Sequence, residues 1–147
     1  MVLDSGSSFA AANLSTGGFA ATDTEASIAQ GALTFTYKGA NILLYWQPAE
    51  QQTPQGLVAS NYQQLVDSQP SVTFLAISEG EIIVSEATGW YGGFVASDTT
   101  SDSTGGGLIG AWICSESSTA FLLEATGPDA TSLQIRFDRV TSGFSCR

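Results

Sequence analysis

The stretch Gly107–Thr126, GLIGAWICSESSTAFLLEAT, decides how the rest of the chain is organised. It holds two apolar runs, Leu108–Ser115 and Thr119–Thr126, separated by the polar turn Glu116–Ser118. Short apolar runs bounded by turn residues are typical of strands that are buried in a sheet. The stretch is therefore predicted to form a β-hairpin around which the other elements pack.

The two cysteines connect this hairpin to the end of the chain. Cys114 lies in the first run, and Cys146 is the second-to-last residue. A small, even number of cysteines in a Ser/Thr-rich chain with few lysines favours one disulfide and hence an oxidising compartment. Two unpaired buried thiols are the alternative.

Composition limits the classes of function. The chain has 147 residues, enough for one domain. Its net charge of −10 would repel the phosphates of nucleic acid and of anionic lipid headgroups, so neither is expected as a partner. It contains no histidine, which excludes Ser-His-Asp triads, Cys-His dyads and histidine metal sites. We expect no cofactor and no metal, and no apolar run approaches the roughly 18 residues of a membrane span.

Two regions differ in composition. Residues 1–30 are rich in Ser, Gly, Ala and Thr and are predicted to be a flexible leader, whereas residues 31–147 are predicted to form a single domain. Within that domain, alternating apolar residues and turn signals predict strands, and a helix is expected to begin after the N-cap Thr53 with Pro54 in its first turn. The expected strands are Leu33–Tyr37, Ile42–Gln47, Val72–Ile77, Glu81–Glu86 and Trp90–Ser97, with turns at Lys38–Asn41 and Ser78–Gly80 and a polar loop over Asp98–Gly107.

The segment ATSLQIRFDRVTSGF, residues 130–144, fits two structures. Leu133, Ile135 and Phe137 alternate as in a strand. Leu133, Phe137, Val140 and Phe144 instead recur at helical spacing, with Gly143 placed as a C-cap. The residues alone leave both structures open.

Candidate binding residues lie just before the polar loop and within it. Trp90 and Tyr91 are aromatic anchors that adjoin this loop in sequence, and together with Asp98 and Asp102 they are the predicted partner-binding surface. Calcium binding by the same loop is an alternative, although its spacing matches no EF-hand. Five aromatic residues with polar edges are a second candidate site, for stacking on sugars. They are Tyr45, Trp46, Trp90, Tyr91 and Trp112. A carboxylate pair for glycoside hydrolysis from Glu79, Glu81 and Glu86 is a third.

The order of the elements resembles a known fold. A leading hairpin precedes a Thr-Pro-initiated helix with a central tyrosine, Thr53–Gln69, and an ISEGE segment, Ile77–Glu81, follows. A strand with a glycine pair, a Trp-x-Cys strand and the terminal segment Thr141–Cys146 complete the order. This layout resembles the PsbP-like fold, which is shared by the PsbP proteins of photosystem II, a Ran-binding nuclear import factor and actinobacterial lipoproteins of the LpqN type. The resemblance covers Leu33 to Cys146.

The predicted strands, joined by short turns, and the helices argue for an antiparallel sheet with helices packed on it, the α+β class. The resemblance implies the arrangement, an α/β/α sandwich with a central antiparallel sheet of about six to seven strands and two main helices. It thereby favours a helix over Asp129–Ser142. It also implies a non-enzymatic role, because members mostly bind other proteins, and no binding residue of the family can be matched here. The expected function is an exported binding or assembly module for a protein partner, extracytoplasmic and either secreted or held by a lipid anchor in the full-length product. A carbohydrate-binding or adhesion domain that uses exposed aromatics is the alternative.

Overall fold

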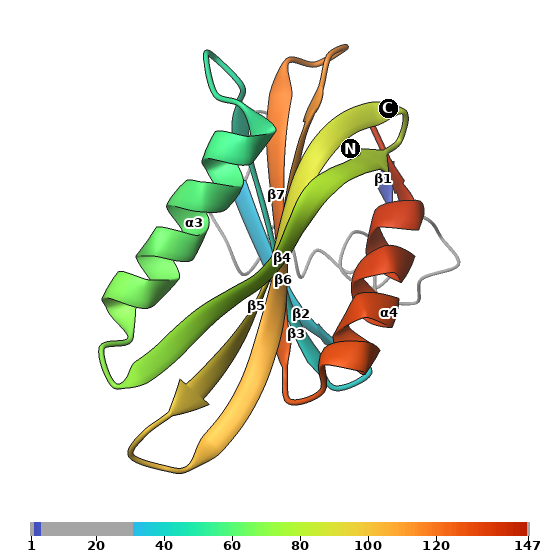
Figure 1. Cartoon of the computed structure of the whole chain (residues 1–147). Coiled ribbons are helices and arrows are strands. Elements are labelled where there is room, and N and C mark those ends of the chain that lie inside the picture. Colours follow the sequence, from blue (N-terminus) through green and yellow to red (C-terminus); the bar gives the residue numbers. More distant parts are fainter. Residues whose placement is uncertain (1, 4–30, 147) are drawn as a thin grey trace.

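The computed structural model describes residues 2–3 and 31–146, and it has the α+β architecture expected from the sequence (Figure 1). Six antiparallel strands form one sheet in the order β2-β3-β7-β6-β5-β4. They are β2 (Gly31–Tyr37), β3 (Ala40–Pro48), β4 (Val72–Val84), β5 (Ala87–Asp98), β6 (Ser103–Cys114) and β7 (Thr119–Gly127). Two helices, α3 (Pro54–Ser68) and α4 (Ala130–Ser142), pack on the sheet, and β1 (Val2–Leu3) pairs with β8 (Phe144–Ser145). The rest of the predicted leader, residues 4–30, lies outside the described residues.

The predicted hairpin of the Gly107–Thr126 stretch is confirmed as β6 and β7, the two middle strands of the sheet. Trp112 is opposite Phe121 in the register, and Cys114 is opposite Thr119. Trp112 and Leu123 are fully buried, and most of the residues of both strands are buried as well. A strand needs such a continuous apolar run when both of its faces are covered, which explains why this stretch lacks the usual alternation.

The two helices lie on opposite faces of this sheet (Figure 1). In β7, Phe121 and Leu123 belong to the same buried cluster as Leu133 and Phe137 of α4. Leu122, which lies between them, points the other way and packs in a second cluster with Val58 of α3. The period of two along a strand thus divides the core into two layers.

Both helices begin at the residues that the sequence indicates. Thr53 is the N-cap of α3, and its Oγ1 accepts a hydrogen bond from the backbone N–H of Gly56 at 3.1 Å. Asp129 is the N-cap of α4, and its carboxylate accepts from the N–H of Thr131. The ambiguous segment that follows Asp129 is therefore a helix, with Leu133 and Phe137 facing the sheet.

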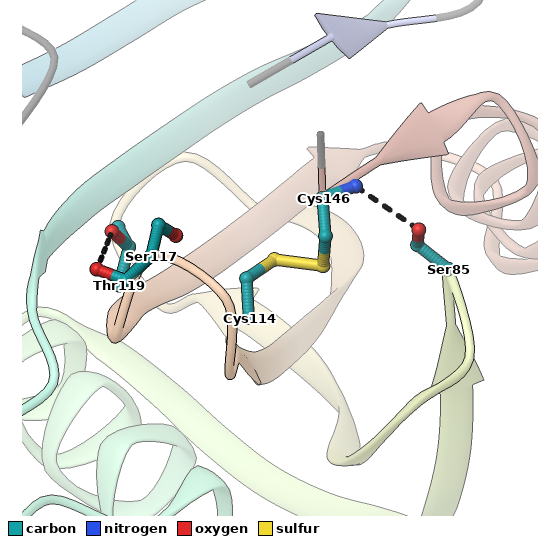
Figure 2. The surroundings of a disulfide bond; sticks show 5 residues. All are labelled: Ser85, Cys114, Ser117, Thr119 and Cys146. Carbon is teal, nitrogen blue, oxygen red and sulfur yellow. Dashed lines mark hydrogen bonds between the residues drawn. A yellow bond between two sulfur atoms is a disulfide. The ribbon is translucent and has the colours of Figure 1, made fainter.

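The disulfide between Cys114 and Cys146 is present, with a Cα–Cα distance of 5.5 Å (Figure 2). It ties the end of the chain to β6 across a sequence separation of 32 residues. The backbone N–H of Cys146 also donates to Oγ of Ser85, at the turn between β4 and β5. The predicted attachment of the chain end to the central hairpin is confirmed.

The predicted hairpin around Ser78–Gly80 is wrong, because β4 runs through this segment as one strand with an irregularity at Ile77. The chain reverses instead at Ser85 and Glu86, which both have positive φ, at 51° and 70°. A two-residue hairpin turn needs such values, and glycine usually supplies them. Gly80 lies within the strand, and its lack of a side chain makes room for a neighbouring ring: a Cβ atom there would lie 3.2 Å from the Tyr91 ring.

The predicted loop over Asp98–Gly107 is also too long. β5 continues to Asp98 and β6 begins at Ser103, so that only residues 99–102 lie between them. The glycines that suggested a loop are strand residues with close neighbours. A Cβ atom on Gly107 would lie 2.3 Å from the Phe94 ring. These glycines allow neighbouring groups to pack closely against the strand, and they do not form a turn.

Candidate functional site

The four residues of the predicted partner-binding surface do not lie together. Trp90 and Tyr91 are consecutive on β5, so their side chains leave opposite faces of the sheet. Trp90 packs against the buried cluster beneath α3, whereas Tyr91 packs against the cluster beneath α4. Both rings are partly buried. Asp98 is eight residues further along β5, which at about 3.3 Å per residue is roughly 26 Å away.

Asp98 uses its carboxylate to close its own turn. Oδ1 accepts hydrogen bonds from the hydroxyl of Thr100 at 2.7 Å and from the backbone N–H of Thr100 at 2.9 Å. These bonds, the hydroxyl first, hold the pKa of Asp98 below its usual value. Asp102 occupies the left-handed region, with φ of 58°. In the described part of the chain, no three His, Cys, Asp or Glu side chains gather as metal ligands would.

Helix α3 is narrower than the sheet that it covers. It packs mainly on β5 and β6. The strands to either side of it, β3 and β7 on one flank and β4 on the other, are left partly open. A hollow follows each flank of the helix.

The larger hollow, which we name the β3 groove, measures about 540 Å³ and separates α3 from β3 and β7. This volume falls within the roughly 300–1,000 Å³ usual for small-molecule sites. Tyr45 is 43% exposed on its floor. The side chains that give it its chemistry are Tyr45, Gln47, Gln52, Leu57, Ser60, Asn61, Gln64 and Leu122.

The polar wall of the β3 groove is built from carboxamides. Gln47 on β3 donates from Nε2 to Oε1 of Gln52 at 2.8 Å, which connects the strand to the loop before α3. Ser60, Asn61 and Gln64 follow along α3, one helical turn from end to end. Sequence analysis missed this set, although the Gln-rich composition of residues 47–64 was a signal for it.

Glu124 is hydrogen-bonded to Asn61 but lies outside the lining of the β3 groove, and it was also not predicted from the sequence. Its carboxyl is largely buried between α3 and the sheet, and this burial raises its pKa, while a side-chain hydrogen bond from Asn61 acts in the opposite direction. Oδ1 of Asn61 is buried without a hydrogen-bond partner. A lone acid in an apolar strand, AFLLEAT, was the signal in the sequence.

The smaller hollow, which we name the Trp90 groove, measures about 320 Å³ on the β4 side of α3. Trp90, Tyr62 and Phe94 give it aromatic walls, and Gln55, Gln63 and Glu79 give it polar ones. It adjoins β4, the last strand of the sheet. Three large aliphatic side chains on β4 are exposed, by 62% for Leu75, 55% for Ile77 and 74% for Ile83.

Comparisons with known proteins show the fold but not a family. No family model matches the chain, and no curated protein matches it. A solved structure that is similar is the crystal structure of PA94 from Pseudomonas aeruginosa, a protein of unknown function with a suggested role as a regulator. The TM-score is 0.56 at 8% sequence identity, over 84% of this chain and 88% of that one. At this identity the likeness concerns the fold alone.

No helix within residues 2–3 and 31–146 is long and apolar enough to cross a membrane.

Proposed function

We propose that this protein is a non-enzymatic, extracytoplasmic binding module of the PsbP-like type, and that it captures a basic, extended segment of a protein partner along β4 and the Trp90 groove. The observation that carries the proposal is the exposed apolar edge of the sheet. β4 spans 13 residues, pairs with β5 along one side, and exposes Leu75, Ile77 and Ile83.

A protein strand suits this edge because it would meet apolar side chains on both faces. Leu75 is opposite Val95 in the register, on the α4 face, and Ile83 is opposite Thr88, on the α3 face. A strand added at an edge turns alternate side chains to the two faces while its backbone extends the ladder. The Trp90 groove then offers an aromatic pocket beside the ladder for one anchoring side chain.

The charge of β4 selects the kind of segment. Glu79 and Glu81 are its charged residues, and the chain as a whole carries −10. Glu79 also lines the Trp90 groove. Complementary charge steers encounter and rejects partners of the same sign, so the segment is expected to carry Lys or Arg between its apolar residues.

The location outside the cytoplasm rests on the disulfide between Cys114 and Cys146. Disulfides persist in oxidising compartments and are rare in the cytosol. The non-enzymatic role rests on the lining of the two grooves, in which amides, hydroxyls and apolar side chains predominate. Amides and apolar side chains hold a ligand without transferring protons, and Glu79 is the one carboxylate among the residues that line the two grooves.

A row of stacked rings for sugars receives less support than a protein partner. Of the five aromatic residues considered, Trp46 and Trp112 are buried, at 4% and 0% exposure. Trp90 and Tyr91 are partly buried on opposite faces. Tyr45 alone among the five is exposed, so the five rings do not form one flat surface.

The experiment is quantitative capture of partners from the extracytoplasmic fraction of the native host by purified protein. Wild type is compared with Trp90→Ala and with the double charge reversal Glu79→Lys/Glu81→Lys, and Tyr45→Ala on the other flank of α3 is the control. We expect the first two variants to lose the proteins that wild type and the control retain, while circular dichroism stays unchanged. If Trp90→Ala unfolds, the charge-reversal variant still tests whether β4 binds the partner, because both of its substitutions lie on the exposed strand. Equal capture by wild type and the charge reversal would refute the proposal.

A further inference from the structure

We infer that the β3 groove is a second binding site, independent of the proposed protein-binding edge, and that its ligand is a neutral oligosaccharide. The two hollows lie on opposite flanks of α3 and share no lining residue. The inference rests on four features of the β3 groove: the absence of charge, the carboxamides, the exposed ring and the length of the open sheet face.

The first feature is the lack of charge. The residues that line the β3 groove include no Asp, Glu, Lys or Arg, although the chain as a whole carries −10. An anionic ligand would enter against the field of the whole protein. A cationic ligand would find no carboxylate among the lining residues to pair with. An uncharged ligand that makes many hydrogen bonds is what this lining can select.

The second feature is the set of carboxamides. Each one offers two N–H donors and a carbonyl acceptor. A sugar hydroxyl is both a donor and an acceptor. Two neighbouring hydroxyls can therefore bind one carboxamide, one of them accepting from its N–H and the other donating to its carbonyl. The bond from Gln47 to Gln52, which joins two exposed side chains, orients the two amides and leaves the carbonyl of Gln47 and the amino group of Gln52 for a ligand. Fixed polar groups cost less conformational entropy on binding than free ones.

Asn61 adds an unsatisfied acceptor to the same wall. Its amide donates to the carboxyl of Glu124, which leaves Oδ1 buried without a partner. A buried polar atom without a hydrogen bond costs free energy that a ligand group can recover. A hydroxyl group that reached this oxygen, after a small rotation of the side chain, would supply the missing hydrogen bond.

The third feature is an apolar floor for the C–H face of a sugar ring. Tyr45 presents its ring to solvent from β3, and Leu57 and Leu122 continue the floor toward α3. A tyrosine gives a rigid apolar face with a hydroxyl at its edge. One exposed ring with amides on both sides is enough for one sugar unit.

The fourth feature is length. The side chains that follow Tyr45 at every second position of β3 are Leu43 and Asn41, on the same face of the sheet. A hollow of about 330 Å³ lies over them, bordered by Thr34, Thr36, Thr126 and Glu124, whose carboxyl is largely buried. From Gln47 to Asn41 this open face runs for roughly 20 Å at about 3.3 Å per residue. A chain of several sugar units fits this face better than a single sugar.

The pairing of β3 argues against a peptide at this site. β3 is bonded to β2 on one side and to β7 on the other, so its backbone groups are already used in the ladder. An extended peptide binds best where it can add to a free edge. In the β3 groove only side chains are left to recognise the ligand.

The test is titration of the ¹⁵N-labelled protein with maltohexaose, cellohexaose, mannohexaose and xylohexaose, followed by amide chemical shifts. Polygalacturonate, an anionic saccharide, and an uncharged Ser/Gly/Asn peptide are run alongside. We expect at least one neutral hexaose to shift amides of β3 and of the Ser60–Gln64 side of α3 at millimolar concentration or below. Tyr45→Ala and Gln64→Ala should weaken that binding about tenfold or more, whereas Trp90→Ala should leave it unchanged.

Three results would overturn the inference. They are no shift in the β3 groove with any neutral hexaose, binding that Tyr45→Ala leaves unchanged, and a larger response to the peptide or to polygalacturonate than to every hexaose. Because Tyr45 and Trp90 lie on different flanks of α3, failure here leaves the protein-binding proposal standing. Loss of partner capture at β4 likewise leaves the saccharide site standing.

Discussion

The ring of Phe137 occupies the space that a side chain at Gly110 would need. A Cβ atom on Gly110 would lie 2.6 Å from Cζ of Phe137 and 3.3 Å from Cδ1 of Ile82. Phe137 lies on α4 and Gly110 in the middle of β6, so this glycine sets how closely the helix approaches the sheet. The glycine in an otherwise apolar strand is therefore a packing residue.

Gly110→Ala should destabilise the fold through overpacking, by about 1–3 kcal/mol. Urea unfolding followed by circular dichroism measures the change. The matched variant Phe137→Leu shortens the side chain that meets the new methyl group. The double variant should therefore lose less stability than the sum of the losses measured for the two single variants. Additive losses, or a Gly110→Ala protein as stable as wild type, would show that the ring has room to move.

Removal of the disulfide should lower stability and release the chain end. A closed loop of this length contributes roughly 4 kcal/mol on the chain-entropy model, because it restricts the unfolded state. The double variant Cys114→Ala/Cys146→Ala should lose about that much in a urea titration. Intact mass after alkylation, with and without reductant, checks the bond first. Two freely alkylated thiols in the unreduced native protein would refute the pairing and weaken the extracytoplasmic proposal.

The N-cap of α3 offers a smaller and more local test. Thr53→Ala removes the side-chain acceptor for the N–H of Gly56 and should cost about 1 kcal/mol. Thr53→Ser keeps a hydroxyl at this position and should cost less than half as much. Because the cap bond closes the first turn of α3, hydrogen exchange should rise at this turn in the alanine variant. Equal stability of all three proteins would mean that the cap bond does not contribute.

Local sequence signals were sufficient for helix α3 and for the central hairpin. Thr53 and Pro54 mark the start of α3 because a cap and a first-turn proline act within one turn of the chain. The run Leu108–Ser115 was recognisable since strands covered on both faces are continuously apolar. The segment after Asp129 needed the resemblance, because helix and strand spacing agree at Leu133 and Phe137.

Features set by contacts between distant residues were not predictable from the sequence. Gly80 and Gly107 looked like turn residues, but a side chain at either position would meet the ring of Tyr91 or Phe94. The turn at Ser85 and Glu86 carries no glycine signal although its φ angles are positive. The β3 groove depends on where α3 crosses the sheet, which no local pattern of residues 54–68 specifies. For the same reason Trp90 was predicted to share a surface with Asp98, which lies at the far end of its strand.

The pKa of Glu124 gives a stability test that depends on pH. Burial raises this pKa above its usual value of 4.5, so the folded state holds the proton more tightly than the unfolded state does. The group therefore favours folding fully below pH 4.5, and this contribution is lost as pH rises through the higher pKa of the folded state. At neutral pH the ionised carboxylate is less stable in its buried position than a neutral amide would be.

Glu124→Gln should raise the melting temperature at neutral pH, because the amide can still accept the hydrogen bond from Asn61 without the cost of burying a charge. The gain over wild type should shrink as the pH is lowered and disappear below the usual carboxyl pKa, where both side chains are neutral. Glu116→Gln, at an exposed turn residue, is the control and should follow wild type throughout. Differential scanning calorimetry at a series of pH values measures all three proteins. A gain that is the same at every pH would assign the effect to packing, and a loss at neutral pH would mean that the carboxylate stabilises the fold through its hydrogen bond with Asn61.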